Sequence, residues 1–239
     1  MERIENNYIV IDTTGPTLKC ALKYSSLAFF KELNMGYLHL ENLVPAINEL
    51  ILNAGILRKQ IDRVFCITGP GSFTGLRIGV TTSNALSFGL DIPSTGFSVF
   101  DIYSYLVFNK SNDKTIELCV PITDAKKNRF FCSFLTKDSM LPTPQDDMHD
   151  LPIEDILNKI SITPEKNILF CGRDNDMVKQ KIDGLKPDNG FRFYNDYSAL
   201  DMISFCDYTI RKGIVSESPE PVYLRKSEAE CALAESKLR

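Results

Sequence analysis

The chain has 239 residues, of which 44% are hydrophobic and 24% are charged, and its formal net charge is -4. This composition favours a packed globular protein over a disordered or fibrous one. Because a protein that grips a phosphate backbone needs a basic surface, the acidic balance argues against a protein that binds nucleic acid by itself, although it allows a subunit of a complex that does.

The seven cysteines are scattered along the chain, with no CxxC pair and no neighbouring histidine. Such a set is a poor disulfide framework and a poor zinc site, so we expect buried thiols in a reducing compartment. The first residues lack the apolar stretch of a signal peptide, and no window is long and apolar enough to span a membrane. We therefore expect a cytoplasmic protein without a membrane partner.

The first half of the chain predicts an α/β or α+β unit that begins with three antiparallel strands. From His39 to Ala54, apolar residues recur at three- and four-residue steps, which predicts a helix that stops at Gly55. The expected strands are 8–12, 18–24, 27–33, 63–68 and 94–96, and the other expected helices are 74–89 and 99–108.

The second half is less regular, and a boundary near residues 109–114 separates it from the first. Residues 140–152 are rich in Pro and Asp and predict an exposed loop, with His149 in solvent. The expected strands are 115–122, 130–136 and 167–171, and the expected helices are 153–160, 174–182 and 199–211.

The segment TGPGSFTGLRIG, at residues 68–79, predicts a tight junction between a strand and a helix. Free amides at the helix start could bind an anion, but the lysine and hydroxyl residue of a P-loop and the GxGxxG fingerprint are both missing. Along the helix, Gly75, Gly79, Ser83 and Ser87 recur every four residues. Glycine inside a helix costs about 1 kcal/mol relative to alanine, so close packing must offset it, either against a partner's helix or against the chain's own sheet.

The N-terminal YIVIDTTGPT resembles the first phosphate loop of actin-like ATPases. In that reading Asp12 helps to hold a hydrated magnesium ion, and the turn at Thr13 and Thr14 faces phosphate. A carboxylate at the end of a strand is also a common structural cap. The two histidines, His39 and His149, are not spaced as paired metal ligands, and there is no GxSxG elbow, so metal or Ser-His hydrolysis has little support.

TGPGSFTGLRIGV, together with VIDTT, closely resembles the bacterial TsaB (YeaZ) family, which belongs to the machinery that makes threonylcarbamoyladenosine on transfer RNA. The helix sequence LHLENLVPAINELILNAGI, the turn at 124–127 and PVYLR at 221–225 agree with the family. The resemblance implies an α/β fold of two actin-like, ASKHA-type lobes. Residues 1–108 would form the N-terminal lobe, which carries the pairing helices, and residues 109–239 a degenerate C-terminal lobe.

The resemblance further implies a non-catalytic scaffold subunit that pairs with TsaD in the complex that forms N6-threonylcarbamoyladenosine at position 37 of tRNAs. TsaD carries the metal-binding histidines and the transfer chemistry, the ATPase TsaE joins the complex, and tRNA is reached only through the complex. A homodimer is implied when TsaD is absent. The chain would have no cofactor of its own, with ATP or ADP and Mg²⁺ as candidates at the complex interface.

By the same resemblance, the pairing surface lies on the two helices of the first half. Its candidate residues are Leu40, Leu43, Val44, Ile47, Ile51, Gly75, Arg77, Gly79, Val80, Ser83 and Ser87. Asp12, Thr13 and Thr14 remain the candidates for contact with a nucleotide. Two residues depart from the family pattern: Arg129 stands where many relatives have an acidic residue, and Lys19 stands at a strand position that is normally apolar or small.

Two other functions stay open at this level. An active actin-like nucleotide-binding phosphotransferase would need two phosphate loops and a carboxylate on the opposite lobe; Asp12 could supply one half, and no DxG loop supplies the other. A protease would need a nucleophile or paired metal ligands, which the sequence does not offer.

Overall fold

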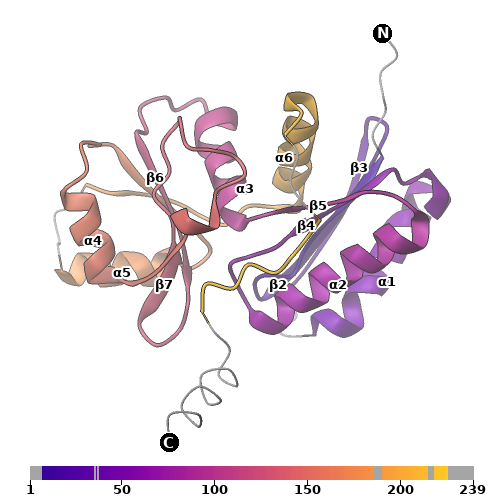
Figure 1. The fold of residues 1–239 in the computed structure, drawn as a ribbon, viewed down its shortest axis with the longest axis horizontal. Coiled ribbons are helices and arrows are strands. Elements are labelled where there is room, and N and C mark those ends of the chain that lie inside the picture. The colour runs from indigo at the N-terminus through magenta and orange to yellow at the C-terminus, as the bar shows by residue number, and fades with distance from the viewer. Residues whose placement is uncertain (1–6, 35, 37, 186–189, 215–217, 226–239) are drawn as a thin grey trace, which may run out of the picture.

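The computed structural model describes residues 7–34, 36, 38–185, 190–214 and 218–225. Figure 1 shows two lobes side by side, each built around a five-stranded sheet. In the first sheet β1 is central, with the antiparallel strands β2 and β3 on one side and the parallel strands β4 and β5 on the other. The first lobe contains β1 (Tyr8–Asp12), β2 (Thr17–Tyr24), β3 (Leu27–Asn34), α1 (His39–Ala54), η1 (Arg58–Gln60), β4 (Arg63–Ile67), α2 (Phe73–Leu90) and β5 (Ser94–Phe97).

The second sheet repeats this topology around β6, with β7 and β8 on one side and the parallel strands β9 and β10 on the other. Its two antiparallel strands after β6 are shorter than those of the first sheet: β7 and β8 have four residues each, whereas β2 and β3 have eight. The remaining elements are α3 (Val99–Tyr105), the π-helical η2 (Leu106–Lys110), β6 (Leu118–Asp124), β7 (Arg129–Cys132), η3 (Gln145–Asp147), β8 (His149–Pro152), α4 (Ile153–Ser161), β9 (Ile168–Cys171), α5 (Asn175–Leu185), β10 (Arg192–Tyr194) and α6 (Ala199–Lys212).

This architecture confirms the expected fold of two actin-like lobes with a reduced second lobe. The helix expected at His39–Ala54 has these same bounds in the structure. The prediction of an exposed loop over 140–152 is wrong at its end, because β8 lies there and pairs with β7. β8 and β10 are short edge strands, and neither shows an alternation of apolar and polar residues. Their pairing depends on residues distant in sequence, so the local pattern does not predict them.

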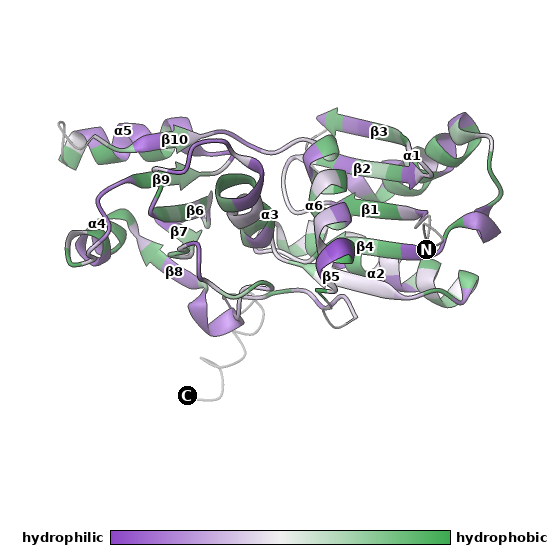
Figure 2. Cartoon of the chain, turned by 90° about the horizontal axis from the view of Figure 1, so that it is seen from above, coloured by the Kyte–Doolittle hydropathy of each residue, from purple (hydrophilic) through white to green (hydrophobic). Residues whose placement is uncertain are grey.

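Helices cover both faces of the first sheet (Figure 1). On one face, α1 packs against β2 and β3, and α2 packs against β4. Figure 2 shows the central strands β1 and β6 as largely hydrophobic, which agrees with their burial.

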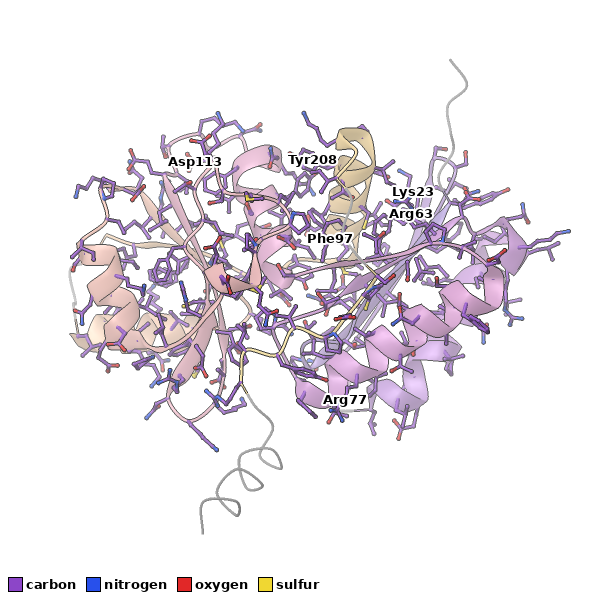
Figure 3. All side chains as sticks on the ribbon, viewed as in Figure 1. Lys23, Arg63, Arg77, Phe97, Asp113 and Tyr208 are labelled. Atoms are coloured by element: carbon purple, nitrogen blue, oxygen red, sulfur yellow. The ribbon has the colours of Figure 1, made fainter. Side chains whose placement is uncertain are left out.

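On the other face of the first sheet lies α6, which packs against β2 and β3 although it comes from the end of the chain. Phe97 lies in this region, at the centre of the molecule (Figure 3). Its ring packs edge-on against the ring of Phe205 on α6. The lobe division at residues 108 and 109 stays a prediction. Among the described helices, none is long and apolar enough to cross a membrane.

Six cysteines lie in the part of the chain that the structure describes, and all six are buried free thiols; Cys231 falls outside it. Burial raises the pKa of the Cys20 and Cys132 thiols to about 12. Because the thiolate is the reactive form, we expect iodoacetamide at neutral pH to leave both residues unmodified in the folded protein and to modify them in denaturant. Peptide mass spectrometry measures this, and rapid labelling of either residue in the native protein would contradict the buried placement.

Candidate functional site

The stripe of small residues on α2 lies against the chain's own first turn. A Cβ atom added at Gly75 would lie 2.0 Å from the backbone oxygen of Thr13, and one added at Gly79 would lie 2.4 Å from the Thr13 hydroxyl. That hydroxyl donates a hydrogen bond of 2.7 Å to the carbonyl of Gly75. Ser83 is also buried, and Ser87 donates from its hydroxyl to the Ile92 carbonyl. Gly75 and Gly79 therefore pack on the chain's own turn after β1, and contact of the stripe with a partner's helix stays a prediction.

The other predicted pairing residues divide into buried and exposed groups. Four of them belong to the core of the first lobe: Leu43, Ile47, Ile51 and Val80. Leu40 and Val44 are exposed to 71% and 52%, and Arg77 is also exposed. Arg77 projects from α2 (Figure 3), stacks on the Phe73 ring and donates a hydrogen bond to the Tyr223 hydroxyl. Direct contact with a partner is thus open to Leu40, Val44 and the solvent side of Arg77.

Two further exposed apolar side chains lie on the same helices and were not predicted. Leu52 of α1 is 78% exposed, and Phe88 of α2 is 91% exposed. We call Leu40, Val44, Leu52 and Phe88 the outer apolar set. For Leu52 the signal is its place on α1, eight residues after Val44 and out of phase with the core residues Leu43, Ile47 and Leu50, whereas no comparable signal marks Phe88 on α2. Large exposed apolar side chains that gather on neighbouring elements mark interaction surfaces.

The turn after β1 is closed by groups of this chain. One carboxylate oxygen of Asp12 accepts from the Thr14 amide, and the other accepts from the Tyr197 hydroxyl, each at 2.8 Å. Arg173, from the turn between β9 and α5, donates from Nη2 to the Thr14 hydroxyl at 2.9 Å. Its Nη1 lies 1.1 Å from the point where a Cβ on Gly15 would be. The guanidinium therefore lies against the turn that resembles a phosphate loop.

A cleft of about 690 Å³ opens beside this turn, between the two lobes. Gly71, Ser72 and Phe73 at the start of α2 form one wall, and the β6–β7 turn around Asp124 forms the other. The C-terminal segment crosses the cleft: the Val222 amide donates to the Thr68 carbonyl, and Arg225 pairs with Asp150 of β8. The cleft is thus lined by both lobes and bridged by the last described residues.

The phosphate-loop resemblance implies a nucleotide with Mg²⁺ at this turn, and the residues present do not fit that group. Arg173 fills the space above Gly15, and both carboxylate oxygens of Asp12 already accept hydrogen bonds. Among the described residues, no group of three or more His, Cys, Asp or Glu side chains could hold a metal ion. Thr13 faces α2 rather than the cleft, because its hydroxyl is bonded to Gly75.

The two histidines are placed for structural contacts. His39 is buried, and its Nε2 lies 2.7 Å from the Gly15 carbonyl oxygen. His149 was expected in solvent, but it lies on β8 beside the Phe134 ring, and partial burial lowers its pKa. Lys19, the unusual strand residue, is buried and pairs with Asp196 at 2.6 Å.

Comparisons with known proteins agree with this architecture. A family model described as "TsaD: tRNA N6-adenosine threonylcarbamoyltransferase" matches residues 36–140. The chain is 27% identical to the Bacillus subtilis tRNA threonylcarbamoyladenosine biosynthesis protein TsaB over 188 residues, which cover 77% of this chain and 78% of that protein. It is 25% identical to the Haemophilus influenzae TsaB protein over 233 residues, which cover 91% of this chain and 92% of that protein.

Among solved structures, YeaZ from Pseudomonas aeruginosa has a TM-score of 0.70 at 21% identity, over 92% of this chain and all of that one. Another solved structure from that organism, described as similar to a peptidase YeaZ, has a TM-score of 0.71 and the same identity and coverage. These two structures share the fold, and the TsaB relatives match the sequence along most of its length. The comparisons therefore support the resemblance to the TsaB (YeaZ) family that the sequence motifs indicate.

Proposed function

We propose that the chain is a non-catalytic scaffold subunit of the machinery that forms threonylcarbamoyladenosine on tRNA, and that it pairs with a TsaD-type catalytic subunit. The observation that carries the pairing is the outer apolar set on α1 and α2, whose members are more than half exposed in the isolated chain. Both helices lie within residues 36–140, the part that matches the TsaD model. Two related chains can associate through equivalent faces about a pseudo-twofold axis, as in an isologous dimer.

The same argument covers the remaining partners. When the TsaD-type subunit is absent, two copies of this chain would pair through the outer apolar set, because a twofold dimer buries the same patch of both subunits. A TsaE-type ATPase joins the complex, and tRNA is bound only by the assembly, in keeping with the acidic net charge of this chain. Any ATP or ADP with Mg²⁺ would bind at the subunit junction.

A reconstituted modification assay tests the scaffold role. We expect the chain alone to modify no tRNA, and the TsaD-type and TsaE-type subunits to modify tRNA only when the chain is added. Nucleoside analysis of digested tRNA by mass spectrometry measures the product. Modification by the chain alone would show it to be an enzyme, and full modification without it would remove the scaffold role.

The phosphotransferase alternative makes an opposite prediction for nucleotide binding. Because Arg173 lies against the β1–β2 turn and each carboxylate oxygen of Asp12 already accepts a hydrogen bond, we expect titration calorimetry of the isolated chain with ATP and Mg²⁺ to give no binding heat. Micromolar binding would favour the phosphotransferase. A peptidase has little support in the described residues, since His39 contacts a backbone carbonyl and His149 faces a phenylalanine ring.

A further inference from the structure

One positively charged side chain of the second lobe reaches into the first lobe. Arg173 follows Gly172 at the end of β9, and its guanidinium reaches across to Thr14 and Gly15 in the turn after β1. A Cβ at Gly172 would lie 2.0 Å from the Ile122 carbonyl, so the backbone before Arg173 is held tightly against β6. The side chain therefore starts from a fixed point on the second lobe and ends on the first.

The surroundings of Arg173 are acidic and joined to one another. The Tyr103 hydroxyl donates to Asp196 at 2.9 Å, the Tyr197 hydroxyl donates to Asp12 at 2.8 Å, and Lys19 pairs with Asp196. Burial lowers the pKa of the Arg173 guanidinium, but Asp12 and the other acidic neighbours raise it, and the net shift is upward. The site is therefore built for a permanent positive charge.

One nitrogen of the Arg173 guanidinium group is in an unfavourable environment. Its Nε is enclosed and has no hydrogen-bond partner among the described residues. An enclosed donor without a partner destabilises a fold unless other contacts offset it. The contacts of the guanidinium include those to Thr14 and Gly15 of the first lobe, so the joining of the lobes helps to hold Arg173 in this position.

We infer that Arg173 is a built-in cation that fills the β1–β2 turn and holds the two lobes together there without a nucleotide. Glycine at position 15 leaves room for the guanidinium, and Thr14 supplies its acceptor. The inference concerns the cleft and does not depend on pairing through α1 and α2.

Gly15→Ala tests this inference, because the new methyl group would take the position of Nη1 and displace the guanidinium. Gly15 does not need a left-handed backbone, so alanine fits its conformation. We expect hydrogen exchange of residues 13–17 and 172–175 to rise by about ten-fold, which corresponds to a loss of about 1.4 kcal/mol in local stability. Gly89→Ala and Gly184→Ala are matched controls, because nothing lies within 4 Å of a Cβ at either position. If hydrogen exchange of these two segments in Gly15→Ala equals that in the control variants, the inference is overturned.

Two milder variants keep the test decisive if Gly15→Ala does not fold. Thr14→Val removes the acceptor of Arg173 at nearly constant volume, and Arg173→Met removes the charge and keeps most of the side chain. Each should raise exchange in both segments in the same direction, and unchanged exchange in both variants would contradict the inference. Wild-type exchange should also be insensitive to ADP with Mg²⁺ and to inorganic phosphate, and protection of residues 13–17 by either would show that the turn takes an external ligand instead.

Discussion

Gly75→Ala is expected to lower the free energy of unfolding by about 3 kcal/mol, the upper end of the range for overpacked sites. The added methyl carbon would lie 2.0 Å from the backbone oxygen of Thr13, and a backbone atom cannot rotate away as a side chain can. Relief would require α2 to move from the turn after β1, which would also lengthen the bond from the Thr13 hydroxyl to the Gly75 carbonyl. Urea denaturation followed by circular dichroism measures the change.

Gly89→Ala is the control for this prediction, since it lies in the same helix with nothing within 4 Å of the new Cβ. We expect Gly89→Ala to raise stability by about 0.5–1 kcal/mol, because alanine restricts the unfolded chain and favours the helix. Equal effects of the two substitutions would mean that α2 does not pack against Thr13 as described. A bulky residue at Gly79 should likewise act on folding first, because an added Cβ there would lie 2.4 Å from the Thr13 hydroxyl.

Val44→Asp is expected to weaken pairing with the TsaD-type subunit by about 100-fold, or roughly 2.7 kcal/mol, because it places a charge in an apolar contact that excludes water. Val44 is 52% exposed in the isolated chain, so the substitution should leave the free energy of unfolding nearly unchanged. Titration calorimetry of the purified subunits measures the affinity. Phe88→Ser should act in the same direction from α2.

Ile162→Asp serves as the matched control for Val44→Asp. Ile162 is an exposed apolar residue at the end of α4 in the second lobe, away from α1 and α2. We expect this variant to bind the partner with wild-type affinity. If both single variants, Val44→Asp and Phe88→Ser, bind the partner with wild-type affinity, the pairing surface lies elsewhere on the chain.

The sequence predicts the two helices of the first lobe well, because their apolar periodicity is a local signal. It does not predict which surface α2 buries. Small residues every fourth position suit a partner's helix and the chain's own turn equally, and the choice depends on Thr13, which lies 62 residues before Gly75. The same limit applies to Arg173, whose contact with Thr14 joins residues that are 159 positions apart.

The turn after β1, beside the cleft, shows what the sequence predicts and what it misses. The residues around Asp12 are those of a phosphate loop when they are read along the chain, and the turn has the expected place after β1. Its occupation by Arg173 and the engagement of Asp12 by Tyr197 arise only when the second half folds back onto the first. Local pattern therefore located the turn, and tertiary contacts placed Arg173 and Tyr197 against it.

The most direct test of the scaffold account is co-expression of the chain with the TsaD-type subunit of the same organism, followed by size-exclusion chromatography with light scattering. We expect a single peak whose mass equals one copy of each subunit, and separate peaks when the chain carries Val44→Asp. Separate elution of the two wild-type proteins, under conditions in which each is folded, would contradict the proposal that this chain is the pairing partner.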